Sequence, residues 1–246
     1  MANNLDLQIL ENSQALADEA LCYILQCAEE AIKKQGRFVF ILAGGSTPQN
    51  IYRALKNKTT FEHWVLLYGD ERFLAEDDSE RNAQLFLKAT GQEDGSLHHA
   101  THIAFPAKTK DATEQSLSDA AMAYQQAIKA YLPADLCLLG MGEDGHTASL
   151  FPHNLLSDSK QENLVFAINN SPKAPKERLT LSYQCLAASS ELLLLANGEA
   201  KSEAIAHILN EQEPRLPVQN LMQIRHASKS TAAFHLWLDK SAAAKL

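Results

Sequence analysis

Four short apolar runs, each followed by a glycine and polar residues, constrain the fold of this chain more than any other feature of its sequence. The runs and their glycines are Phe38–Ala43 with Gly44, Trp64–Tyr68 with Gly69, Ala134–Leu139 with Gly140, and Glu191–Ala196 with Gly198. Their length and apolar content are typical of buried strands in a parallel sheet, and helical patterns such as Ser13–Lys34 alternate with them. We therefore predict one domain over residues 1–246, a Rossmann-like three-layer α/β/α sandwich with a mostly parallel sheet.

The turn after the third run, Gly140–Pro152, is the strongest candidate for a reactive site. It reads GMGEDGHTASLFP and contains one histidine, His146, close to two carboxylates, Glu143 and Asp144. Imidazole can accept and return a proton near neutral pH, and a neighbouring carboxylate can orient it. Because the carboxyl ends of parallel strands share one edge of a sheet, this histidine should meet the other glycine turns. A glycine-rich turn with a solvated histidine would give the same pattern.

The first glycine turn is a candidate phosphate site. Its residues Gly44, Gly45, Ser46 and Thr47 precede a helical pattern, and Pro48 suits the first turn of that helix. Free backbone N–H groups and the positive end of the helix dipole would then face one point, which favours an anion. We expect Ser46 or Thr47 to cap the helix. The turn lacks the dinucleotide-binding and P-loop signatures, so an ordinary capped turn is the alternative.

Charged residues follow other predicted strands. The segment Asp70, Glu71, Arg72 comes after the second run, where it could contact a substrate or form a surface ion-pair cluster. Lys201 lies near the start of a helix, a position unfavourable for a cation unless an anion is nearby. The predicted loop Asn169–Ser182 carries three further cations, which are Lys173, Lys176 and Arg178. They indicate either a solvated basic loop or a flank that adds positive charge to a bound phosphate.

The overall charge and the cysteines restrict the class of partner. The net charge is −8 and the pI is about 5.6, which argues against nucleic acid and requires any phosphate site to be local. The four cysteines lack metal-ligand spacing and indicate reduced thiols and no metal site. The N-terminus has no secretory leader and no apolar run is as long as a membrane span, so we expect a cytoplasmic protein without a membrane partner.

Five motifs, in order along essentially the whole chain, resemble the 6-phosphogluconolactonase family. They are GGSTP at Gly44–Pro48, GDER at Gly69–Arg72, SERN at Ser79–Asn82, GMGEDGHTASLFP at Gly140–Pro152 and PKERLTLS at Pro175–Ser182. The resemblance implies the fold expected above and hydrolysis of 6-phospho-D-glucono-1,5-lactone to 6-phosphogluconate, the second step of the oxidative pentose phosphate pathway. It implies a small-molecule substrate and no cofactor, and we expect a monomer. The SERN motif matches loosely, so no role is assigned to Ser79 or Asn82.

The resemblance and the residues imply the same chemical roles. His146 would deprotonate a water for attack on the lactone carbonyl carbon, and Asp144 would orient the imidazole. A lactone is already an activated ester, so no metal is required. The chain has no GxSxG motif, which argues against a nucleophilic serine.

The binding roles follow from the charged residues. The backbone N–H groups of Gly44 to Ser46 and the Ser46 hydroxyl would hold the phosphate, together with the side chains of Arg178 and Lys201. Arg72 would join them or contact the sugar. Asp70 would position sugar hydroxyls or support Arg72.

Two other functions are open to such a chain. Glucosamine-6-phosphate deaminases share the GGSTP and DGH motifs, but they typically carry a glutamate where this chain has Phe151 and an aromatic residue in place of Arg72. A non-catalytic sugar-phosphate sensor would normally append a basic helix-turn-helix, which no segment here supplies. A second histidine, His235, alternates with apolar neighbours in the predicted strand Thr231–Leu238 and is expected to be structural.

Overall fold

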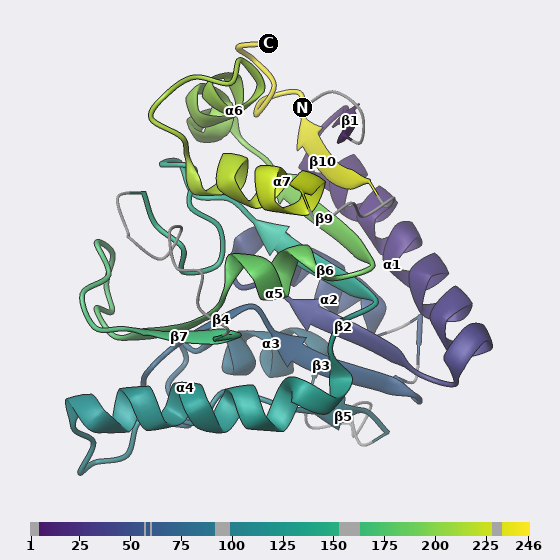
Figure 1. Ribbon diagram of the computed structural model, residues 1–246. Helices are drawn as coiled ribbons and strands as arrows, with labels where there is room; N and C mark the ends of the chain where they lie inside the picture. The colour runs from purple at the N-terminus through teal and green to yellow at the C-terminus, as the bar shows by residue number, and fades with distance from the viewer. Residues whose placement is uncertain (1–4, 57, 60, 92–98, 153–162, 228–232) are drawn as a thin grey trace.

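A seven-stranded parallel sheet forms the centre of the molecule (Figure 1). The computed structural model describes residues 5–56, 58–59, 61–91, 99–152, 163–227 and 233–246. The strand order is β1-β10-β9-β6-β2-β3-β5, and every neighbouring pair is parallel. The strands are β1 (Leu5–Leu10), β2 (Phe38–Leu42), β3 (Trp64–Tyr68), β5 (Thr101–His102), β6 (Leu136–Gly140), β9 (Glu191–Ala196) and β10 (Phe234–Asp239).

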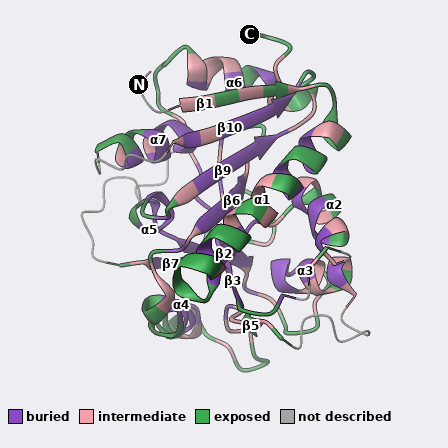
Figure 2. Cartoon of the chain, turned by 90° about the vertical axis from the view of Figure 1, so that its right-hand side faces the viewer, coloured by how far each residue is buried: buried purple, intermediate pink, exposed green. Residues whose placement is uncertain are grey.

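Helices cover both faces of this sheet, which confirms the predicted three-layer sandwich (Figure 1). One face carries α1 (Ser13–Gln35), α2 (Ser46–Leu55) and α3 (Asn82–Thr90). The other face carries α4 (Glu114–Ile128), α5 (Tyr183–Ala187) and α7 (Pro217–Ala227), and α6 (Ser202–Leu209) follows β9. The strands β2 and β3 are buried along their whole length (Figure 2), and this burial on both faces explains why they read as continuous apolar runs.

A second, three-stranded antiparallel sheet lies beside α4. Its order is β4 (Asp70–Arg72), β8 (Arg178–Leu181), β7 (Val165–Ile168), and α4 packs against β7 and β8. The prediction that Arg178 lies in a surface loop is wrong, because Arg178 opens β8 and is 6% exposed. The sequence of β8 alternates polar and apolar residues, but all four are buried, so its polar residues do not mark a solvent-exposed face.

Other element boundaries depart from the predictions in small ways. The strand expected at Thr231–Leu238 is β10, which begins at Phe234; Thr231 lies outside the described part of the chain. The helix expected over Ser13–Lys34 is α1, which is capped by the Asn12 side chain. The elements β1, α5 and α7 were not predicted.

Candidate active site

The candidate site lies where the direction of strand connection reverses in the parallel sheet. From β2 the chain builds β3 and β5 on one side and then crosses to β6, β9 and β10 on the other. The turns after β2 and β6 therefore part from each other at the carboxyl edge of the sheet, which is the usual place for a ligand in such folds. A cavity of about 330 Å³ opens there.

The cavity brings together the polar turns that follow four different strands. Its lining includes nearly all the site residues predicted from the sequence, which are Gly44, Gly45, Ser46, Thr47, Asp70, Arg72, His146, Arg178 and Lys201. Asp144 does not line the cavity and acts on it through His146. Of the two lysines left open by the sequence, Lys173 lines the cavity and Lys176 does not.

The first glycine turn leaves the N-terminus of α2 without a side-chain cap. Gly45 occupies the N-cap position with φ 96°, a left-handed conformation that favours glycine, and no side chain bonds the free N–H groups there. The expectation that Ser46 or Thr47 caps the helix is wrong, because both lie inside it and the Thr47 hydroxyl donates to Asn197 Oδ1. The positive end of α2 thus faces a cavity with its backbone donors available for an anion.

His146 is oriented by Asp144, as expected. The imidazole Nδ1 bonds Asp144 Oδ1, and Lys173 Nζ lies 3.5 Å from the same oxygen. Burial raises the pKa of Asp144, but the hydrogen bond and charge of His146 and the charge of Lys173 outweigh burial and hold the pKa below its usual value. The ionised carboxylate therefore selects the imidazole tautomer with its proton on Nδ1, which leaves Nε2 as the proton acceptor.

Position 142 has no room for a side chain, because His146 and Asp144 pack directly against the Gly142 backbone. A Cβ atom on Gly142 would lie 2.0 Å from His146 Cε1 and 2.5 Å from Asp144 Oδ1. The turn is closed by hydrogen bonds from Gly142 N to His146 O at 2.8 Å and from Gly145 N to Gly142 O at 3.0 Å. The imidazole and its carboxylate thus pack directly on a backbone that only glycine can provide.

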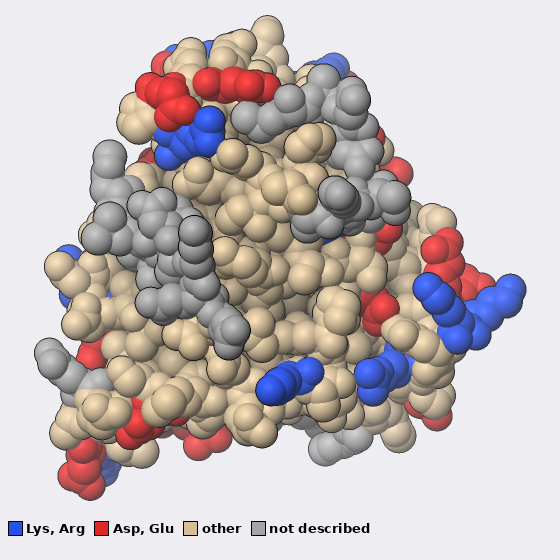
Figure 3. All heavy atoms as spheres, viewed as in Figure 1, with Lys and Arg blue, Asp and Glu red and all other residues tan. Residues whose placement is uncertain are grey.

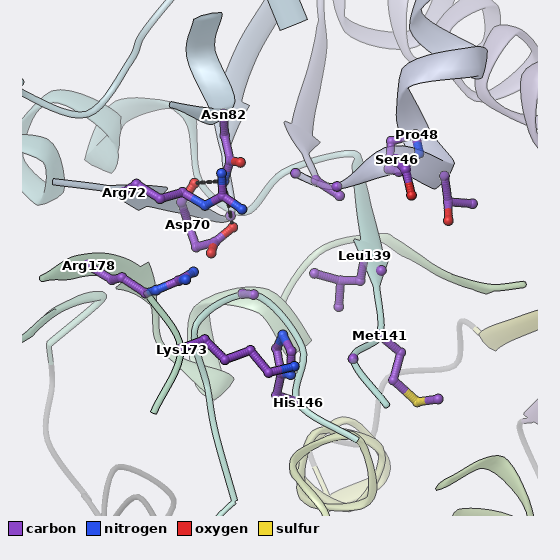
Figure 4. A pocket seen from close by; sticks show the side chains of 18 of the residues that line it. Ser46, Pro48, Asp70, Arg72, Asn82, Leu139, Met141, His146, Lys173 and Arg178 are labelled. Atoms are coloured by element: carbon purple, nitrogen blue, oxygen red, sulfur yellow. Dashed lines mark hydrogen bonds between the residues drawn. The ribbon is translucent and has the colours of Figure 1, made fainter. Parts of the chain in front are cut away.

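Asp70 lies on the opposite wall beside Asn82 (Figure 4), and its carboxylate is held by Asn82 and by the buried Ser149, two residues to which the sequence assigned no role. Asn82 Nδ2 donates to Asp70 Oδ1 at 3.0 Å and to the Asp70 carbonyl at 2.9 Å, and the Ser149 hydroxyl donates to Asp70 Oδ2 at 2.6 Å. Asp70 therefore does not support Arg72 through a direct bond, and Arg72 Nη1 donates to the Glu80 carbonyl instead. Both oxygens of the Asp70 carboxylate are held in place by the protein.

Two arginines face each other on this wall. Arg72 and Arg178 are directly opposite in the β4–β8 pair, an arrangement of like charges that destabilises a sheet unless an anion is present. Burial lowers the pKa of Arg178, the Asp70 carboxylate opposes that shift, and the charge of Arg72 adds to it. Arg72 Nε is buried without a hydrogen-bond partner in the described part of the chain. The pair is therefore suited to an anionic ligand.

Lys201 supplies a further cation, at the start of α6 as predicted. Burial lowers the pKa of Lys201, Glu143 opposes that shift, and the nearby charge of Lys173 adds to it. The two lysines therefore form a second positive region near His146. On the face in Figure 3, Lys and Arg side chains are scattered among uncharged atoms and form no continuous basic patch.

Glu71 is a structural residue, although it lies beside Asp70 in sequence. It is fully buried, and its carboxylate accepts hydrogen bonds from the backbone of Arg72, Asn82 and Ala83 and pairs with Arg81 Nε at 3.5 Å. Successive residues of a strand point to opposite faces, so Asp70 reaches the cavity and Glu71 anchors the start of α3. The possibility that Glu71 contacts substrate is thereby excluded.

His235 lies outside the cavity, in agreement with its predicted structural role. Its ring bonds Asp6 at 2.7 Å, Glu191 at 3.0 Å and Tyr23 at 2.9 Å, which ties β10 to β1, β9 and α1. Within the described residues, no group of three or more His, Cys, Asp and Glu is arranged to hold a metal ion. No helix of that same part of the chain is long and apolar enough to cross a membrane.

Known proteins resemble this chain over most of its length. Residues 11–231 match the family described as glucosamine-6-phosphate isomerases/6-phosphogluconolactonase. The 6-phosphogluconolactonase of Mycobacterium tuberculosis is 31% identical over 257 residues, covering 98% of each chain. That of Rattus norvegicus is 30% identical and covers 96% of this chain and 92% of its own.

Solved structures agree on the fold. A 6-phosphogluconolactonase from Trypanosoma cruzi superposes with a TM-score of 0.85 at 22% identity, over 100% of this chain and 98% of that one. A monomeric glucosamine-6-phosphate deaminase superposes with a TM-score of 0.75 at 21% identity, over 98% of this chain and 100% of that one. The fold is therefore shared by both activities, and only the residues of the site can separate them.

Proposed function

This chain belongs to the family of glucosamine-6-phosphate isomerases and 6-phosphogluconolactonases, and on that premise we propose that it hydrolyses 6-phospho-D-glucono-1,5-lactone to 6-phospho-D-gluconate. It would act as a carboxylic ester hydrolase in the oxidative pentose phosphate pathway. The observation that carries the proposal is the His146–Asp144 pair, which opens onto the same cavity as the uncapped N-terminus of α2.

The phosphate would anchor the inert end of the substrate. Backbone N–H groups at the start of α2, from Gly44 to Thr47, would bind its oxygens together with Arg178 and Lys201. Arg72 would join these cations or contact the sugar. Fixing this end would hold the lactone carbonyl near His146, which converts the attack of water into a reaction between positioned groups.

His146 would act first as a base and then as an acid. Its Nε2 would take a proton from a water while the water oxygen bonds to the carbonyl carbon, which yields a tetrahedral intermediate. As that intermediate collapses, the bond from the carbon to the ring oxygen breaks, and His146 would return the proton to the ring oxygen. The ionised Asp144 would stabilise the imidazolium formed between the two steps.

Phe151 weighs against the deaminase reaction. Its ring lies 4.6 Å from the His146 imidazole, and the Arg178 guanidinium carbon lies 5.6 Å from the ring centre. The position that carries a glutamate in typical deaminases is thus filled by an aromatic side chain that packs against both functional groups. No carboxylate is available there to shuttle protons.

Hydrolysis of the lactone by the purified protein tests the proposal. We expect acid release above the spontaneous rate, its loss in a His146→Ala variant, and no ammonia release from glucosamine 6-phosphate. His226→Ala is the matched control, because His226 is exposed on α7 and does not line the cavity. If the His146→Ala variant retained the unmodified rate, the general-base assignment would be refuted.

A further inference from the structure

We propose that Ser149 is a positioning residue for substrate binding, whose hydroxyl fixes the Asp70 carboxylate and keeps Arg178 from pairing with it directly. The inference rests on the proposed function of the cavity. Ser149 is fully buried and does not line the cavity, so it can act only through residues that do. Asp70 and Arg178 both line it.

The Ser149 hydroxyl lies between the two charged groups. It donates to Asp70 Oδ2 at 2.6 Å, and Arg178 Nη1 approaches its oxygen at 3.4 Å. The Ser149 backbone N–H donates to Thr180 Oγ1 at 3.3 Å, and Thr180 is the residue opposite Asp70 in the β4–β8 pair. Ser149 is thus bonded to both β4 and β8, the two strands that carry Asp70 and Arg178.

The separation matters because a carboxylate and a guanidinium normally pair directly. A bidentate arginine–carboxylate pair would use the donors and acceptors that a substrate needs. Among the ion pairs of the described residues, none joins Asp70 to Arg178, although their charges still influence each other. The hydroxyl takes one acceptor site on Asp70 Oδ2 and Asn82 takes one on Oδ1, so each oxygen keeps a further lone pair for a ligand.

The N–H donors of Arg178 are likewise only partly used within the protein. Its Nε donates to the Pro175 carbonyl at 3.1 Å and its Nη2 to the Ala174 carbonyl at 2.8 Å, while Nη1 approaches Ser149. A guanidinium carries five N–H donors, so two are left for an anionic ligand. The guanidinium is held rigidly without being neutralised, which suits the recognition of a phosphorylated sugar.

Asn82 completes the arrangement on the other oxygen of Asp70. Its amide donates to Asp70 Oδ1 at 3.0 Å, so the carboxylate is bonded from both sides and cannot rotate freely. Loss of the Ser149 hydroxyl would leave Oδ2 without its donor and allow the carboxylate to turn toward Arg178. The expected consequence is weaker binding of substrate, with the His146–Asp144 pair left in place.

A Ser149→Ala variant tests this role by separating binding from chemistry. Kinetics with the lactone and calorimetric titration with 6-phosphogluconate would be measured for the unmodified protein and the variant. We expect KM and the Kd of 6-phosphogluconate to rise about tenfold or more, because substrate would first have to break the charge-assisted bond that Asp70 and Arg178 form in the variant, while kcat changes less than about threefold. Ser149→Cys, which keeps a weak donor of similar size, should show a smaller rise.

Ser182→Ala is the matched control. Ser182 is also fully buried, but its hydroxyl caps α5 by accepting from Cys185 N at 3.1 Å, away from the cavity. This variant should lose thermal stability without a change in KM. An unchanged KM and Kd in Ser149→Ala, or a loss confined to kcat, would overturn the proposal.

The two proposals fail in different ways. If the unmodified protein binds 6-phosphogluconate without opening the lactone, the proposed reaction is wrong, and the role of Ser149 is judged from the Kd values alone. If Ser149→Ala does not fold, the test uses Ser149→Cys. A rise in its KM and Kd would support the proposal, and values equal to those of the unmodified protein would refute the need for a strong donor at this position.

Discussion

Replacing Gly142 with alanine would displace the proposed general base without removing any functional group. The new Cβ would lie 2.0 Å from His146 Cε1 and Nδ1, about 1 Å closer than real Cβ contacts allow, so the imidazole must move by about that distance. The turn cannot move instead, because Gly142 N and Gly142 O are both bonded within it, to His146 O and Gly145 N. The Gly142 backbone is not left-handed, so alanine adds no strain of its own.

A shift of about 1 Å in a catalytic group costs on the order of 100-fold in rate. We therefore expect Gly142→Ala to lower kcat for lactone hydrolysis by about that factor, with KM little changed because the phosphate contacts are untouched. Gly140→Ala is the matched comparison in the same turn, since its Cβ would meet no atom closer than 3.9 Å and should cost far less. A Gly142→Ala enzyme with kcat within about threefold of the unmodified value would refute this reading of the turn.

Four further substitutions test separate parts of the structure. Asp144→Asn should lower kcat by up to about 10⁴-fold at an unchanged fold, measured by lactone kinetics and thermal melting, because the imidazole loses its orienting charge and favoured tautomer. Lys201→Ala should raise KM by about tenfold or more with a smaller effect on kcat, since it removes a proposed phosphate contact. Glu71→Gln should lower the free energy of unfolding in urea by about 3 kcal/mol, because it leaves the buried Arg81 unpaired; an unchanged midpoint would contradict the structural role. Burial lowers the pKa of His235, but hydrogen bonds to two carboxylates outweigh burial and raise the pKa. The protonated imidazole therefore stabilises the fold at low pH, and this contribution is lost as the pH rises through the raised pKa. His235→Gln should therefore destabilise the fold more near pH 6 than near pH 9 in urea unfolding, and an equal loss at both pH values would disprove the charge effect.

The sequence by itself determined the elements whose signals are local. Runs such as Phe38–Leu42 are apolar along their whole length because both faces of the strand are covered, so the strand and the layers around it could be predicted. The pairing of His146 with Asp144 was also predictable, because two residues of one tight turn are brought together by the chain itself. The convergence of the glycine turns followed from the shared edge of a parallel sheet.

Only the tertiary structure decided which distant residues meet. Ser149 reaches Asp70 across 79 residues of sequence and Asn82 across 12, from different elements, and no spacing rule connects either of them to Asp70. Arg178 reads as part of a polar loop, yet its strand pairs with β4 and places it opposite Arg72. Such contacts depend on strand register and on how separate elements pack, and both are set by the burial of the whole core and not by neighbouring residues. Local patterns therefore located the cavity and the His146–Asp144 pair, while packing determined which distant side chains hold the opposite wall in place.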